Sequence, residues 1–389
     1  MKRFFICLIC ILTLAGCALP RNSSSNREER SENIGVSSGG VWISYSEVNS
    51  MLKSENGFRA EFDRVIQSCR EAGLGEIYLH IRSHCDSLFK SDYFPQNKFA
   101  KELDYDPFEY AVDKCRSNGI KIHAWINPYR VNAASDDITA LDKDSPAYKW
   151  LNDDNTENDV NVVRFGGIYL NPAESAVREL IINGIRELLS KYTVDGLHFD
   201  DYFYPTIDED FDAQCFSAQT EFDDLAKWRL NNISLMVGEI YSAVKAVDKD
   251  ILVGVSPQGN MENNYEYMYA DVKKWCSEEG YIDYICPQIY FGYENSVKPY
   301  EDTLQQWADI CTTDVTLVAG LGVYKIDSER EFSENIGIIG RQINDAVVSY
   351  NYAGAAVYGY GSLFGGSDRG AQEQECIEIA FDKLDTSVK

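Results

Sequence analysis

The chain has 389 residues, a length that suits one large domain such as an α/β barrel better than one small core. Its formal net charge of −26 argues against nucleic acid or an anionic lipid surface as a partner. Tyrosine occurs 25 times, an excess that suits rings stacking on flat, hydroxyl-rich ligands as well as ordinary half-buried packing.

The first twenty residues, MKRFFICLICILTLAGCALP, have the pattern of an export signal: Lys2 and Arg3 precede an apolar stretch, and small residues precede Cys17. The apolar stretch is too short to span a membrane. Its ending, LAGC, is similar to a lipobox, in which the cysteine is lipidated and becomes the first mature residue. We therefore expect a signal peptide over residues 1–17 and a lipid anchor on Cys17, which places the protein in the cell envelope, anchored to a membrane and facing outside the cytoplasm.

Residues 18–38 are polar and rich in serine, asparagine and arginine, which predicts a flexible tether ahead of one folded domain over residues 39–389. Eight cysteines follow Cys17 without dense spacing or a C-x-x-C pair, so buried free thiols are favoured over a disulfide framework, although one or two bridges remain possible. We expect a monomer.

Short apolar runs alternate with segments of helical periodicity from Gly40 onward, the pattern of repeated βα units. The strand candidates are 40–45, 76–81, 120–126, 194–199, 251–256, 281–290, 315–324 and 354–360. Eight units without remainder predict an α/β fold of the closed (β/α)8 (TIM) barrel type. An open doubly wound sheet is the alternative, but no glycine-rich phosphate loop follows the first strand.

Two connections are longer than a barrel needs, residues 83–106 and 127–172. Both follow the carboxyl ends of strands, where barrel enzymes keep their sites, so we expect them to form walls of a cleft.

The segment VDGLHFDDYFYP places two aspartates where an apolar strand ends. Because side chains alternate along a strand, His198, Asp200 and Tyr202 should face the barrel interior, with Asp200 pointing into its mouth. Asp201 begins the turn and should point elsewhere. Either aspartate could instead cap the next turn.

Further polar groups fall just past other strand ends. Candidate carboxylates besides Asp200 and Asp201 are Asp86, Glu294 and Glu47. Candidate substrate-binding residues are Arg82, His84, Trp125, Asn127, Tyr129, Arg130, His198, Gln258, Asn260, Gln288, Tyr290 and Tyr358. Carboxylates with amides, arginine and aromatic rings in one cleft match what a sugar needs, because polar side chains bond its hydroxyls and rings support its faces.

Glycosidic cleavage usually uses two carboxyl groups, one as acid and the other as nucleophile or base. Asp200 can supply one, and Asp86, Glu294 or Glu47 the other. The alternatives are a non-catalytic glycan-binding lipoprotein and a metal-dependent amide or ester hydrolase.

The four histidines, at positions 80, 84, 123 and 198, do not have ligand spacing, and no Cys/His cluster accompanies them. His80 and His123 are best interpreted as core residues. No G-x-S-x-G motif supports a Ser-His-Asp triad. We expect neither a metal nor a cofactor.

Seven segments in barrel order resemble the glycosyl-hydrolase-like family 10: GVWISY, IYLHIRSHCDSLFKSDYFP, GIKIHAWINPYR, VDGLHFDDYFYP, VGVSPQGN, IDYICPQIYFGYE and GLGVYK. The resemblance implies a (β/α)8 hydrolase of bacterial envelopes, with members that cut peptidoglycan glycan strands, notably those stripped of stem peptides. Its site positions fall on Arg82, Asp86, Asn127, Tyr129, Arg130, Asp200, Asp201, Gln288 and Tyr290. Ser83 departs from the family, which commonly has proline there.

DGLHFDDY also resembles the strand-four pattern of chitinase-like barrels, with Asp200 at the third aspartate and Tyr202 in place of the catalytic glutamate. That likeness implies that Asp200 could orient a substrate N-acetyl group for substrate-assisted attack. We therefore expect an envelope-anchored glycosidase that acts on peptidoglycan-type glycan or a related polysaccharide.

Overall fold

The computed structural model describes residues 39–388, with side chains through Leu384. The expected signal peptide, the lipidation site Cys17 and the tether over residues 18–38 lie outside the described residues. Within them, no helix combines the length and the apolar character needed to cross a membrane.

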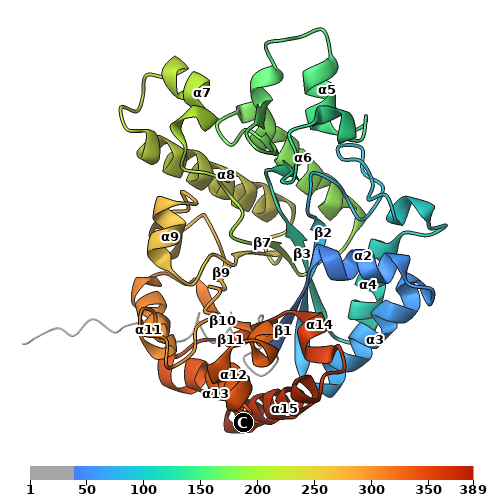
Figure 1. The fold of residues 1–389 in the computed structure, drawn as a ribbon, viewed down its shortest axis with the longest axis vertical. Helices are drawn as coiled ribbons and strands as arrows, with labels where there is room; N and C mark the ends of the chain where they lie inside the picture. The colour runs from blue at the N-terminus through green and yellow to red at the C-terminus, as the bar shows by residue number, and fades with distance from the viewer. Residues whose placement is uncertain (1–38, 389) are drawn as a thin grey trace, which may run out of the picture.

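Eight parallel strands close into a barrel, which confirms the fold predicted from the sequence (Figure 1). The order around the barrel is β1-β11-β10-β9-β8-β7-β3-β2. The strands are β1 (Gly39–Ile43), β2 (Leu74–Arg82), β3 (Lys121–Ile126), β7 (Gly196–Phe199), β8 (Leu252–Val255), β9 (Tyr284–Ile285), β10 (Thr316–Gly322) and β11 (Gly354–Tyr358). β9 is much shorter than the expected 281–290. Beyond it, the chain pairs with its neighbours only through isolated β-bridges at Gln288.

Helices surround the barrel (Figure 1). The longer ones are α2 (Tyr45–Lys53), α3 (Gly57–Glu71), α4 (Pro107–Ser117), α6 (Ser175–Lys191), α8 (Leu225–Val247), α11 (Tyr300–Ile310) and α15 (Asp368–Val388). The shorter ones are α5 (Pro146–Asn152), α7 (Ala213–Ala218), α9 (Met261–Glu266), α10 (Val272–Ser277), α12 (Arg330–Glu334), α13 (Ile338–Asn344) and α14 (Tyr360–Phe364). Single turns are η1 (Ala100–Glu102), η2 (Ile138–Ala140), η3 (Asp159–Asn161), η4 (Glu209–Phe211), η5 (Val323–Asp327) and η6 (Asp345–Ser349).

The helix layer is held by apolar stripes at helical spacing. In α3, Phe58, Phe62, Val65 and Cys69 are fully buried, while the residues between them are mostly exposed. Such a stripe buries one face against the barrel and leaves the other in water. Burial of each large side chain contributes about 1.5–3 kcal/mol of transfer free energy.

The barrel interior is aromatic and contains a hydrogen-bonded chain of neutral groups. Trp42 Nε1 donates to His198 Nε2 at 2.9 Å, so His198 carries its proton on Nδ1, 2.9 Å from the Tyr284 hydroxyl. Tyr284 in turn lies 3.0 Å from Nδ1 of His123. Burial lowers the pKa of His198 well below its ordinary value and that of His123 to about 3, so both rings are uncharged.

The connection after β3 forms a small antiparallel sheet of β4 (Arg130–Asn132), β6 (Ile168–Leu170) and β5 (Val162–Arg164), in the order β4-β6-β5. This sheet meets the connection after β7, because Phe211 packs edge-on against Phe165 and Tyr169. Together, the two connections form a wall above the carboxyl ends of the strands.

Candidate active site

Asp200 and Asp201 lie directly after β7, at the carboxyl end of the barrel. Asp200 is only 3% exposed: Trp125 Nε1 donates to its Oδ2 at 3.2 Å, and the Tyr202 amide donates to its Oδ1 at 3.0 Å. Asp201 is half-buried, and its carboxylate accepts from Gln288 Nε2 at 3.4 Å and from the Gln258 side chain.

The two carboxyl groups titrate as a pair. Burial, and next the charge of Asp201, raise the pKa of Asp200 to about 8. Burial also raises the pKa of Asp201, while Gln258, Gln288 and Arg130 oppose that rise. Because two like charges resist ionising together, the pair holds a proton near neutral pH, which is the state that a general acid needs.

Arg130 supplies the positive charge of the site. Its Nε donates to the carbonyl of Ser83 at 2.9 Å, which fixes β4 to the loop after β2. The guanidinium lies 4.7 Å from the ring centre of Tyr202 and 5.5 Å from that of Tyr45, and it favours the ionised form of both aspartates.

A pocket of about 290 Å³ opens beside the pair. Its lining is Arg130, Ala133, Tyr169, Asp201, Tyr202, Phe203, Tyr204, Pro205, Gln258 and Met268. Asp201 is the one carboxylate in this lining, whereas we had expected Asp200 to face the mouth. The reason is local: Asp200 continues the inward alternation of β7 and lies beside Trp125, and the turn that follows directs Asp201 to the pocket.

Three tyrosines from neighbouring strand ends form an aromatic cluster. The rings of Tyr290 and Tyr358 are stacked with centres 6.0 Å apart, and Tyr324 meets both edge-on at 5.8 and 6.1 Å. Tyr324 was missed as a site residue, as was Tyr45, which contacts His84 edge-on at 5.1 Å. Each is the last residue of a predicted strand, at 40–45 and 315–324, and that position is the signal that could have found them.

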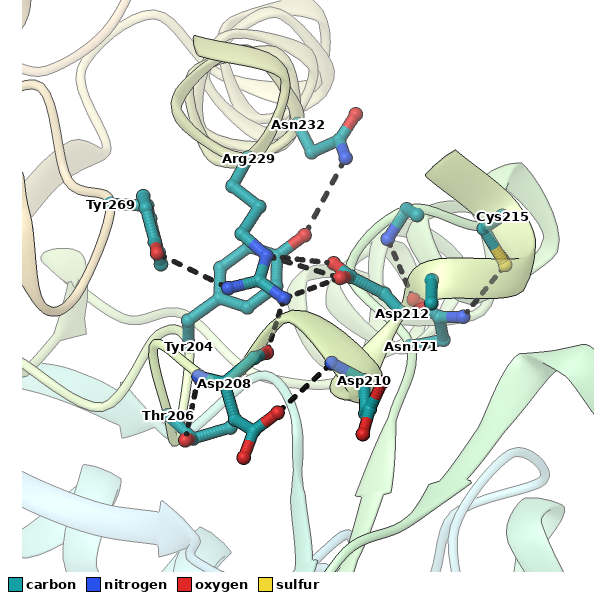
Figure 2. Close-up of polar contacts among 12 residues, drawn as sticks. Asn171, Tyr204, Thr206, Asp208, Asp210, Asp212, Cys215, Arg229, Asn232 and Tyr269 are labelled. Carbon is teal, nitrogen blue, oxygen red and sulfur yellow. Dashed lines mark hydrogen bonds and ion pairs between the residues drawn. The ribbon is translucent and has the colours of Figure 1, made fainter. Parts of the chain in front are cut away.

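A buried ion pair between Arg229 and Asp212 stabilises the pocket wall (Figure 2). The Arg229 side chain, from α8, is fully buried; its Nε lies 3.1 Å from both carboxylate oxygens of Asp212, and its Nη2 donates to the carbonyl of Asp208 at 2.7 Å. Its Nη1 donates to the Tyr269 hydroxyl at 3.1 Å, and the guanidinium lies 5.2 Å from the Tyr204 ring centre. Arg229 therefore joins the segments that supply Tyr204 and Met268 to the pocket.

Arg82 does not reach the cleft, contrary to its expected role. A register shift between His80 and Arg82 breaks the alternation of β2, so that Arg82 pairs with Ile126. Its guanidinium lies 3.7 Å from the centre of the Phe94 ring and close to Gly184 of α6. Burial lowers the pKa of Arg82 to about 10.

Tyr129 and His198 are also buried away from the pocket. Tyr129 is 1% exposed and belongs to the main core between barrel and helices. His198 belongs to the interior hydrogen-bonded chain and is fully buried.

Two of the three other expected carboxylates serve local structure. Glu47 accepts from the amide and hydroxyl of Ser44, both at 2.7 Å, and from the amide of Gly361 at 2.5 Å. Asp86 accepts from the amides of Ser83 and His84, both at 3.0 Å. Glu294 is exposed. None of the three carboxylates belongs to the pocket lining.

The remaining expected residues divide between the site and its supports. Asn127 is buried and accepts from Trp125 Nε1 at 3.1 Å, so it shares that donor with Asp200. His84 is half-buried, and its Nδ1 lies 2.9 Å from the hydroxyl of Ser83. Asn260 caps α9 by accepting from the amide of Glu262 at 3.1 Å.

Over residues 39–388, no group of three or more His, Cys, Asp or Glu side chains is arranged to hold a metal ion. The expected absence of a metal or cofactor remains a prediction.

A closed parallel barrel with an acidic pair after its fourth strand, beside amides and tyrosines, places this protein in the class of glycoside-hydrolase-type TIM barrels. The family model described as Glycosyl hydrolase-like 10 matches residues 38–336, and the chain belongs to that family.

Two relatives are called glycosyl hydrolases. The chain is 27% identical to Glycosyl hydrolase YngK of Bacillus subtilis over 84% of its length, and 28% identical to Glycosyl hydrolase DigH of Escherichia coli K12 over 65%. It spans 66% and 63% of those proteins, respectively, which is slightly less than two thirds.

Solved structures share the fold. The PgaB (BpsB) glycoside hydrolase domain of Bordetella bronchiseptica superposes with a TM-score of 0.58 at 13% identity, covering 86% of this chain and 98% of that domain. An endo-1,4-β-mannanase of Rhizomucor miehei gives 0.53 at 14% identity, covering 90% and 94%.

Proposed function

We propose that this protein is an envelope-anchored glycoside hydrolase that cleaves a peptidoglycan-type glycan or a related polysaccharide. One observation carries the proposal: Asp201 lines a sugar-sized pocket, and the buried Asp200 beside it has a pKa that burial and the charge of Asp201 raise to about 8. The family of the chain and the names of its relatives support a glycosidase. The lipobox-like LAGC at Cys17 supports the anchoring.

Asp201 is the proposed catalytic acid, because it is the carboxylate that faces the pocket. The neighbouring Asp200 resists ionising together with Asp201, because the charge of Asp201 raises the pKa of Asp200. Gln258 and Gln288 orient the Asp201 carboxylate through their hydrogen bonds. The aromatic cluster of Tyr290, Tyr324 and Tyr358 offers faces for further sugar units.

The nucleophile is proposed to come from the substrate. Asp86, Glu294 and Glu47 are absent from the pocket lining, so the scheme with one of them as the second carboxyl loses its support. A glycan with N-acetyl groups carries an internal nucleophile, which is one of the exceptions to the rule of two carboxylates. The substrate class that fits is therefore an N-acetylated glycan.

Kinetics of single variants test the assignment. D201N should lower kcat by about 10²–10⁴-fold on N-acetylated glycan strands, as loss of a general acid does. E294Q, which changes an exposed carboxylate outside the pocket, should match the wild type and serves as the control. De-N-acetylated strands should bind without being cut. Full turnover by D201N would contradict the role of Asp201, and equal cleavage of both strand types would contradict the internal nucleophile.

The pH dependence offers a second check. Activity needs the proton of the pair, and the pKa of Asp200 is raised to about 8. We expect kcat/KM to hold near neutral pH and to fall as pH rises through about 8. A profile that loses activity near pH 5 on its alkaline side would contradict a raised pKa.

A further inference from the structure

Two cysteines of the helix layer lie at the two ends of the segment that carries Gln288 and Tyr290. Cys276 lies in α10, and Cys311 follows the last residue of α11. The carbonyl of Cys276 accepts from the amide of Thr312 at 3.3 Å and from the hydroxyl of Thr313 at 2.9 Å. Main-chain contact of this kind brings the two cysteines close, and the neighbouring Cys311 thiol, together with burial, raises the pKa of the Cys276 thiol well above its ordinary value. A disulfide needs such closeness of both main chain and sulfur atoms.

The two cysteines of the pair also differ from each other in burial. Cys276 is fully buried, whereas Cys311 is half-buried. Cys69 and Cys115 are near each other as well, yet both are fully buried. A half-buried attacking thiol with a fully buried partner suits exchange through a mixed disulfide.

The segment between the two cysteines carries part of the site. Residues 276–311 include β9, which has only two residues in its ladder, and both Gln288 and Tyr290. Outside this ladder, further backbone hydrogen bonds hold the segment to its neighbours, such as those from the Cys286 amide to the Val255 carbonyl at 2.8 Å and from the Gln288 amide to the Pro257 carbonyl at 2.9 Å. A covalent link between its two ends would restrict the unfolded chain over a loop of this length, which typically contributes stability.

We propose that Cys276 and Cys311 form an oxidisable pair, a site of disulfide formation that braces the β9 segment. Cys311 attacks a small-molecule or protein disulfide and releases one thiol; Cys276 then attacks the Cys311 sulfur and releases the second. Two thiol groups of the protein and one external disulfide thus become one internal disulfide and two external thiols. Export, if the leader acts as expected, would bring the pair to such oxidants.

Peptide mass spectrometry of the purified full-length protein tests the pair. The protein is incubated with oxidised glutathione, denatured without reductant, alkylated and digested. We expect a linked peptide pair containing Cys276 and Cys311, with Cys69 and Cys115 alkylated. Cys276 and Cys311 both found alkylated, or each found linked only to glutathione, would overturn the proposal.

Thermal unfolding gives a second measurement. The oxidised wild type should lose about 5 °C or more of Tm when a reductant is added, because the closed loop is opened. C276S should show no change with reductant, whereas C115S, the matched control at another fully buried cysteine, should keep the wild-type response. A reductant effect that persists in C276S would overturn the assignment. Neither measurement uses catalysis, so their outcome is independent of the proposed function.

Discussion

The raised pKa of Asp200 lowers the free energy of unfolding at pH values where the same aspartate is ionised in the unfolded chain. Its folded-state pKa of about 8 lies above the ordinary value of 3.8, so the folded protein holds a proton that the unfolded chain has released between these pH values. The free energy of unfolding should therefore fall as pH rises from about 4 to 8. The sign is the reverse of that for an aspartate stabilised by an ion pair.

D200N removes this titration and keeps the shape of the side chain. Its unfolding free energy, relative to the wild type, should increase by up to about 1.4 kcal/mol per pH unit between pH 4.5 and 7.5. Denaturant unfolding at several pH values measures the difference, with E294Q as the control. A pH-independent difference would show that Asp200 ionises normally in the folded protein.

Arg82 offers a contrasting test, because its guanidinium is buried without a hydrogen-bond partner and lies over Phe94. Replacement of a poorly compensated buried charge by an apolar side chain of similar length is often neutral or stabilising. We expect R82M to unfold at the same Tm as the wild type or higher and to retain catalysis. A large loss of kcat would return Arg82 to the set of site residues.

At the scale of elements, the walls of the pocket depend on α8 through Arg229. R229M leaves Asp212 buried and uncompensated, so the protein should lose about 3–5 kcal/mol of stability. KM should rise more than kcat falls, because the segments that supply Tyr204 and Met268 shift while the aspartate pair keeps its own hydrogen bonds.

R178M is the matched control for that variant. Arg178 joins α6 to α8 through an ion pair with the partly exposed Glu239, and neither residue belongs to the pocket lining. R178M should lower the free energy of unfolding by about 1 kcal/mol or less and leave KM unchanged. If R229M lowers stability and keeps the wild-type KM, Arg229 supports the fold alone.

The strand-end residues show how far sequence reasoning reaches. Periodicity predicted all eight barrel strands, because each buried run is bounded by polar segments. The same alternation placed Asp200 inside the barrel correctly but failed at Arg82, where a bulge in β2 reverses the direction of the side chain. Bulges and turn geometry depend on neighbouring chains, and so local pattern does not reveal them.

For the molecule as a whole, the sequence predicted one barrel, and the described residues form one. The sequence also suggested carboxylates at four strand ends as candidates, without indicating which of them lie together. The bonds from Ser44 to Glu47 and from Ser83 to Asp86 are local, whereas the bond from the Gly361 amide to Glu47 joins parts of the chain that only folding brings together. Position along the chain thus predicted the face of the barrel, and tertiary contacts determined the site.

The central claim is that the aspartate pair cleaves a glycan. Mass spectrometry of purified glycan strands, with and without stem peptides, after incubation with the protein or its D201N variant tests it most directly. We predict shorter fragments from the wild type alone, with the preferred strand identified by the sample that is cut. Strands left intact by the wild type, while still bound, would contradict a glycosidase and favour a glycan-binding protein.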